Sequence, residues 1–203
     1  TLEEFEAQSV DRVLDGTDDA LSTDDIEPGA QTEDSQRLQE LMASAAALAG
    51  QQNDPKLAKL QEHLTLLLKE GFQPVVFCRY IATAHYLAAA LRAKFKSAAI
   101  AAVTGELTPD EREAAVEQLG ESEARILVAT DCLSEGINLQ NLFTAVVHYD
   151  LSWNPTRHEQ REGRVDRFGQ KAREVRSTML YGEDNPVDGA VLQVILRKAE
   201  SIR

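Results

Sequence analysis

The feature that most limits the fold of this chain is a regular alternation of short apolar runs with helix-forming segments. The runs, such as PVVFCR and RILVAT, are rich in β-branched residues and are not interrupted by regularly spaced polar positions. Strands of this kind are covered on both faces, which is typical of parallel sheets. We expect five strands, at residues 74–79, 98–103, 125–130, 144–150 and 174–181.

The segments between the runs carry helix signals. The clearest begins with Asp54 as N-cap and Pro55 at the first helical position, ends at Gly71, and repeats leucine at spacings of three and four. Other helices are expected at residues 35–49, 81–95, 108–119, 155–168 and 185–202. This alternation predicts an α/β fold, a three-layer domain with a mainly parallel sheet covered by helices on both faces.

The acidic charge of the chain is concentrated at its beginning. Residues 1–36 hold twelve Asp or Glu and one Arg, a net charge of −11 out of −13, which leaves −2 for the remainder. A segment so acidic and so poor in large apolar residues cannot bury enough surface to order itself. We therefore expect a mobile linker or insertion at 1–36 and one domain at 37–203.

Several classes of protein are disfavoured by composition. The two cysteines, Cys78 and Cys132, lie in apolar surroundings and read as reduced core thiols, and the four histidines show no metal-ligand spacing. We expect no metal site. No apolar run is long enough to span a bilayer and no secretory signal precedes the domain, so an intracellular protein is expected. The chain does not begin with Met, which suggests a fragment.

One basic segment, RHEQREGRVDRFGQ at 157–170, stands out in this acidic chain. On a helix, Gln160, Arg164 and Arg167 fall within roughly 60° of one another. Two guanidinium groups on one face suit bidentate contact with phosphate. The alternative is a solvated helix whose arginines pair weakly with Glu159 and Glu162.

Gly163 favours the phosphate interpretation, because glycine inside a helix costs about 1 kcal/mol relative to Ala. Close approach of a ligand or of another backbone would explain it. In parallel sheets ligands bind beyond the carboxyl ends of the strands, so we expect the arginines to face that rim. Arginines turned into the interior, or away from the rim, would contradict the interpretation.

These residues resemble a known family. QREGRVDRFGQ is similar to motif VI of superfamily-two helicases, VATDCLSEGINL to motif V, PVVFCRY to motif IV, and TGELTPDER to the phosphate-contacting turn that follows motif IV. The flanks of motif VI, DLSWNP before it and RFGQ at its end, resemble those of Swi/Snf-type ATP-dependent DNA translocases. The resemblance runs in the family's order from about Pro55 to Tyr181, and it implies a RecA-like domain, the C-terminal lobe of such an enzyme.

The resemblance also implies roles for individual residues. Arg164 and Arg167 match arginine fingers that reach the γ-phosphate of ATP, and Gln160 matches a glutamine that organises the same site. Gly136 and Asn138 match positions at the nucleotide, although many relatives carry Asp where this chain has Asn138. The positions that match or resemble contacts to the nucleic-acid backbone are Arg79, Thr104, Gly105, Arg112 and Thr130. Trp153 either packs on the motif VI helix or faces DNA; Asp150 and His148 read as structural.

The first lobe of the family carries a phosphate loop and a magnesium-binding Asp-Glu-x-His segment, and this chain contains neither. The resemblance therefore implies that ATP and Mg²⁺ are held mainly by a first RecA-like lobe of the same polypeptide, and that this chain alone is inactive. It also implies contact with DNA, most often duplex, and translocation rather than unwinding. The alternative left open is a non-enzymatic α/β module that binds a nucleotide or an acidic partner.

Overall fold

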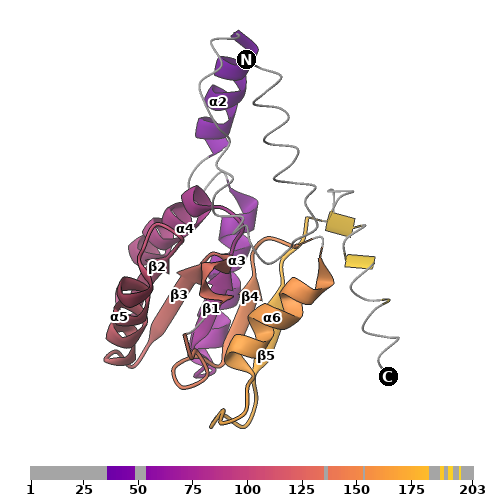
Figure 1. Ribbon diagram of the computed structural model, residues 1–203. Helices are drawn as coiled ribbons and strands as arrows, with labels where there is room; N and C mark the ends of the chain where they lie inside the picture. The colour runs from indigo at the N-terminus through magenta and orange to yellow at the C-terminus, as the bar shows by residue number, and fades with distance from the viewer. Residues whose placement is uncertain are drawn as a thin grey trace.

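The structure is a computed structural model that describes residues 36–48, 54–134, 137–152, 154–182, 188–189, 192–193 and 197. Its centre is a five-stranded sheet in the order β2-β3-β1-β4-β5 (Figure 1). The strands are β1 (Pro74–Phe77), β2 (Ala99–Val103), β3 (Arg125–Ala129), β4 (Ala145–His148) and β5 (Arg176–Met179).

Every pair of neighbouring strands is parallel. Val76 lies opposite Val128 of β3 and Val147 of β4, so the first strand along the chain occupies the middle of the sheet. All four residues of β1 and of β4 are buried, as continuous apolar runs predict. The expected α/β fold with a parallel sheet is confirmed, and each strand lies within its predicted range.

The helices that follow the strands are α4 (Ile81–Lys94), α5 (Pro109–Gly120) and α6 (Pro155–Val165); α3 (Pro55–Lys69) precedes β1. Successive strand residues point to opposite faces, which makes two cores. Val76 belongs to a core with leucines of α3 and α4. Val75 and Phe77 belong to a second core, which includes Val116 of α5 and Val165 of α6. The three layers follow from this division.

Local signals explain where these helices begin. The Asp54 carboxylate accepts the Leu57 N–H at 2.9 Å, and Pro55 occupies the first turn of α3. At α5, Thr108 and Glu111 form a reciprocal capping box. Gly71 ends α3 with a φ of 87°, a conformation that glycine adopts without strain.

Helix α2 (Gln36–Leu48) stands apart from the sheet in Figure 1. Leu41 and Met42 are 59% and 63% exposed. The packed part of the described chain therefore starts at Asp54. The domain boundary expected at 36/37 stays a prediction, and the acidic segment 1–35 lies outside the described residues, as does most of the helix expected at 185–202.

Candidate functional site

The carboxyl ends of the strands form a rim, because all five strands are parallel. Backbone hydrogen bonds join successive loops along it: Thr130 N–H to Val103 C=O at 3.2 Å, and Cys78 N–H to Ala129 C=O at 2.9 Å. The loops that carry Thr104, Thr130 and Arg79 are thus neighbours, although they are far apart in sequence. The parallel sheet therefore brings these three residues to one edge, and their contact with nucleic acid stays a prediction.

The side chains on the rim differ in how available they are. Thr104 and Thr130 are buried, at 1% and 0% exposure. The Thr104 hydroxyl donates to the Glu106 carboxylate at 3.3 Å, and that carboxylate also contacts His85 at 2.7 Å. Gly105 is exposed. A phosphate at this turn would therefore meet exposed backbone first, and it would have to displace Glu106 to reach the Thr104 hydroxyl.

Arg112 holds two rim loops together. Its guanidinium donates to the carbonyls of Leu107 at 2.8 Å, Gly105 at 3.2 Å and Cys132 at 3.1 Å. The last of these belongs to the short 3-10 helix η2 (Asp131–Ser134), which follows β3. Arg112 is thus engaged in shaping the rim, and its contact with nucleic acid stays a prediction.

Asp150, after β4, organises the middle of the rim. Its carboxylate accepts the Arg79 N–H at 3.0 Å and pairs with Lys56 at 2.9 Å, while the Lys56 ammonium lies 4.2 Å from the Tyr149 ring centroid. The Arg79 guanidinium is half-buried and lies over Tyr80, 5.2 Å from its centroid. Asp150 therefore has the structural role that the sequence suggested, and Lys56 is a basic rim group that it did not suggest.

Helix α6 has well-defined ends. Asn154 caps it by accepting the Thr156 N–H at 3.0 Å, and Pro155 starts the first turn. The helix ends at Val165, where the Gln170 amide folds back and donates to the Val165 carbonyl at 2.9 Å. Gly169 has a φ of 97° in the turn that follows. The predicted end at 168 is wrong, because side-chain hydrogen bonds and this turn stop the helix earlier.

The inner face of α6 is held by a carboxylate from η2. Arg161, 4% exposed, contacts Asp131 through Nε at 2.6 Å and Nη2 at 2.8 Å, and Arg157 adds a contact at 3.3 Å. Burial alone would raise the pKa of Asp131, but the hydrogen bonds and charges of Arg161 and Arg157 outweigh it and hold that pKa below its ordinary value. These arginines therefore pair with η2.

Two histidines complete the inner face. His148, at the end of β4, is fully buried, and His158 of α6 is 2% exposed. Their Nδ1 atoms lie 3.3 Å apart, and His148 Nε2 lies 3.2 Å from a Glu162 carboxylate oxygen. Burial lowers the pKa of both histidines, and that of His158 falls to about 4. The structural role expected for His148 agrees with this burial.

The outer face of α6 carries the candidate nucleotide contacts. Gln160 is exposed and Arg164 is half-buried. Arg167 is exposed but lies beyond the end of the helix, so the helical angle that placed it beside Arg164 does not apply. A side chain at Gly163 would meet nothing within 4 Å, so no described part of this chain requires the glycine.

The arginines do not lie at the rim. Helix α6 starts at the carboxyl ends of the strands and runs back toward their amino ends (Figure 1), where Gln170 donates to the Phe143 carbonyl at 3.1 Å. Arg164 and Arg167 therefore lie on the flank of α6. The expectation that they face the rim is wrong, because a crossover helix carries its C-terminal half away from the loop that starts it. This position contradicts the phosphate interpretation in the form that rested on the rim, and a nucleotide contact by these arginines now depends on another lobe reaching the flank. The chain presents two surfaces, the rim and this flank.

The remaining predicted residues are divided between the described and undescribed parts. Asn138 is exposed, and nearby Gln140 donates to the Phe168 carbonyl at 3.2 Å, which brings the segment after η2 beside the turn after α6. Gly136 and Trp153 lie outside the described residues. Phe168, which sequence reasoning missed, is fully exposed next to Arg167.

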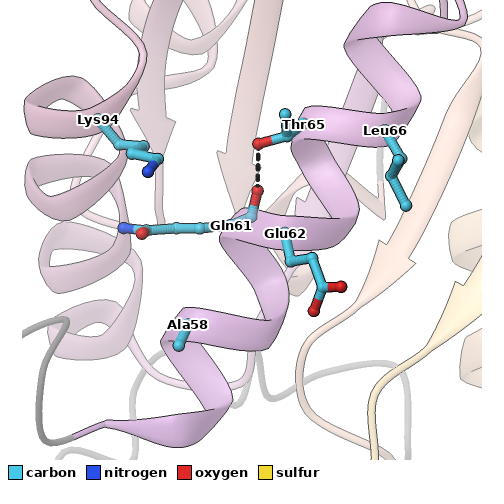
Figure 2. Close-up of a pocket in the computed structure, with 6 residues that line it drawn as sticks. All are labelled: Ala58, Gln61, Glu62, Thr65, Leu66 and Lys94. Atoms are coloured by element: carbon cyan, nitrogen blue, oxygen red, sulfur yellow. Dashed lines mark hydrogen bonds between the residues drawn. The ribbon is translucent and has the colours of Figure 1, made fainter.

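No three His, Cys, Asp or Glu side chains in the described part of the chain are grouped to hold a metal ion. Cys78 and Cys132 are buried free thiols, as predicted. No described helix is both long and apolar enough to cross a bilayer. A cavity between α3 and α4 is lined by Gln61, Thr65 and Lys94 among others, and none of its lining residues is one of the predicted site residues (Figure 2).

A five-stranded parallel sheet covered by helices on both faces is the arrangement of a RecA-like domain. More narrowly, residues 55–169 match the helicase conserved C-terminal domain, and the chain belongs to this family. The matched range spans both surfaces and all five predicted nucleic-acid contacts.

Individual relatives cover only parts of the chain. It is 33% identical over 99 residues to an ATP-dependent RNA helicase eIF4A of Scheffersomyces stipitis, which is 49% of this chain and 24% of the relative. It is 30% identical over 115 residues to an ATP-dependent RNA helicase FAL1 of Meyerozyma guilliermondii, 57% of this chain and 27% of the relative. The chain thus spans about a quarter of the length of these curated relatives.

Solved structures agree on the fold. The C-terminal part of the Fun30 ATPase domain superposes with a TM-score of 0.62 at 20% identity, covering 69% of this chain and 44% of that one. The SWI2/SNF2 ATPase core domain of Sulfolobus solfataricus gives 0.58 at 18% identity, covering 72% and 29%. A DEAD box protein from Methanococcus jannaschii gives 0.57 at 27% identity, covering 71% and 37%.

Proposed function

We propose that this chain is the C-terminal lobe of an ATP-dependent DNA translocase of the Swi/Snf type. The observation that carries the proposal is the division of α6 into two faces. Arg157 and Arg161 are tied to Asp131 on the inner face, whereas Gln160 is exposed and Arg164 is half-buried. Basic groups whose helix is braced from behind are well placed to meet an anion presented by another surface.

The donors on the flank fit a nucleotide. Guanidinium forks of Arg164 and Arg167 suit the γ-phosphate, and the amides of Gln160 and Asn138 suit the remaining polar groups. ATP bound by a first lobe would supply the phosphoryl group, and that lobe would also hold most of the Mg²⁺ ligands. Fingers of this type accelerate phosphoryl transfer by roughly 10³–10⁵-fold.

The rim fits the phosphates of a nucleic acid. Arg79, Gly105 and the N-terminus of α5 offer charge and backbone N–H groups, and such contacts carry little sequence information. Because the rim and the flank are separate, both ligands can be held at once. Closure on ATP at the flank would then move the rim relative to the first lobe's own grip on the strand.

The choice of DNA rests on the flanks of the arginine helix. These flanks, DLSWNP and RFGQ, resemble those of Swi/Snf-type DNA translocases. In this structure they also set the two ends of α6, because Asn154 caps its start and Gln170 closes its end. The curated relatives compared above are named as RNA helicases, so RNA is the outcome that would replace DNA.

The proposal is tested on the complete protein that contains this lobe. We expect ATP hydrolysis to be stimulated at least tenfold by duplex DNA, less by single-stranded RNA, and to be absent from the 203-residue chain alone. Stimulation by RNA alone would overturn the DNA assignment. Tight nucleotide binding by the isolated chain, without hydrolysis in the complete protein, would instead identify a binding module.

A further inference from the structure

A hydrogen-bonded relay of five groups runs behind the arginine helix. The Ser152 N–H lies 3.1 Å from His158 Nε2, the Nδ1 atoms of His158 and His148 are 3.3 Å apart, and His148 Nε2 lies 3.2 Å from Glu162. The Ser177 hydroxyl of β5 donates to the same Glu162 oxygen at 2.6 Å. These hydrogen bonds join the loop before α6 to β4, α6 and β5.

The proton positions in this relay follow from its partners when both imidazoles are neutral. An ionised carboxylate only accepts, so His148 must carry its proton on Nε2 and leave Nδ1 as an acceptor. His158 must then carry its proton on Nδ1, and its Nε2 accepts the Ser152 N–H. Every ring nitrogen is satisfied in this arrangement, which fixes opposite tautomers on the two histidines.

Adding one proton produces a second complete arrangement. The added proton binds His158 Nε2, and the proton that was on His158 Nδ1 passes to His148 Nδ1. His148 then holds protons on both nitrogens, and its Nδ1–H donates to His158 Nδ1. The His158 Nε2–H donates to the Ser152 carbonyl, which already lies 3.1 Å away. A second added proton would set two N–H groups against each other at Nδ1, so the pair accepts only one.

The charged groups around the pair come from two elements, α6 and η2. Glu162 of α6 favours the extra proton, Arg161 of α6 opposes it, and Asp131 of η2 favours it for His148. Burial is the largest influence and lowers the pKa of each imidazole. The neutral arrangement is therefore the one populated near neutral pH.

We propose that His148, His158 and Glu162 are positioning residues. Their hydrogen-bonded relay holds α6 against β4 and the Ser152 loop, and this relay can take up a single proton. The proton decides whether the relay engages the N–H or the C=O of Ser152, at the loop from which α6 starts. This inference deepens the proposed function and rests on it for its effect on ATP hydrolysis.

The relay itself is tested without any activity. Long-range ¹H–¹⁵N spectra of the 203-residue chain near pH 7.5 should show His148 protonated at Nε2 and His158 at Nδ1. On acidification the pair should gain one proton in a single step below the ordinary histidine range. The same tautomer on both rings, or two independent titrations near pH 6.5, would overturn the relay.

The effect on function is tested by the pH profile of ATP hydrolysis in the complete protein. Glu162→Gln keeps an acceptor for His148 and Ser177 but removes the charge that favours the extra proton. The acidic limb of the profile, where the rate of ATP hydrolysis falls with decreasing pH, should therefore move to lower pH by roughly one unit. The control His63→Gln, on α3, should leave this limb in place. A loss of packing alone would lower the rate at every pH.

The outcomes separate the two proposals. An unmoved limb in an active Glu162→Gln enzyme would overturn the positioning role. A complete protein without ATP hydrolysis, but with the predicted tautomers, would overturn the proposed function and leave the relay established.

Discussion

Among single residues, Asp131 carries the largest share of the organisation behind the flank. It lies in η2, directly after β3, and accepts three N–H contacts from Arg157 and Arg161. Arg161 also donates to the Asp150 carbonyl at 3.2 Å. One carboxylate therefore ties α6 to the rim, so any motion of one surface is transmitted to the other.

Removal of this charge should be costly. Asp131→Asn leaves Arg161 buried without its anion, and the free energy of unfolding of the 203-residue chain should fall by about 2–3 kcal/mol. Urea denaturation measures the change. As a matched control, Glu62→Gln breaks an exposed pair with Lys59 and should cost far less, because solvent screens the pair. Equal effects of the two substitutions would show that Asp131 is not a structural centre.

At the scale of elements, α6 and the turn that follows it each contain a glycine, and the two glycines differ in backbone conformation. Gly169 has a φ of 97°, so Gly169→Ala should destabilise the chain by about 1 kcal/mol. Gly163 is helical and a Cβ there meets nothing, so Gly163→Ala should stabilise the chain by about 0.5–1 kcal/mol. Thermal unfolding of both variants checks the signs.

Gly163 also tests the proposed contact with a first lobe. If another surface approaches α6 closely, Gly163→Ala should lower ATP hydrolysis in the complete protein although it stabilises this chain. Unchanged hydrolysis would mean that no close approach occurs at this glycine.

The elements themselves were largely predictable from sequence. Helix starts at Asp54 and Thr108 and the apolar strands are local signals, and the structure has them where the sequence places them. The end of α6 was not predictable, because it depends on Gln170 reaching carbonyls of Val165 and Phe143. A side chain that folds back on the turn leaves no periodic signal.

The candidate site was predicted only in part, for a related reason. Gln160 and Arg164 stand out because their spacing lies within one helix. Asp131 and Arg161 are thirty positions apart, and His148 and His158 belong to different elements. Their pairing is decided when α6 packs on η2 and β4, which the sequence does not encode locally.

At the scale of the whole molecule, stability should fall on mild acidification. Folding depresses the pKa of His158 to about 4 and lowers that of His148, while the unfolded chain takes up protons near pH 6.5. Stability from this source is complete above pH 6.5 and is lost as pH falls toward 4, by on the order of 2–3 kcal/mol. Urea midpoints at pH 7.5 and 5 would differ; equal midpoints would contradict the burial of neutral histidines.

The separation of rim and flank is the property on which the whole account depends. Residues 37–203 are nearly neutral in net charge. Each surface must therefore attract its ligand through a few charged groups at fixed positions, because the domain as a whole has little long-range electrostatic potential. On this account, nucleic acid and nucleotide are engaged by different residues of one rigid lobe, and substitutions should affect one without the other.

The most direct test measures ATP hydrolysis and DNA affinity in parallel for Arg167→Ala in the complete protein. We expect hydrolysis to fall about 10³-fold or more, with DNA affinity changed less than about threefold because the rim is untouched. Arg173→Ala, an exposed arginine in the next loop, is the matched control and should leave both unchanged. Hydrolysis within about tenfold of the parent, on the same scale of finger contributions, would contradict the assignment of the flank to the nucleotide.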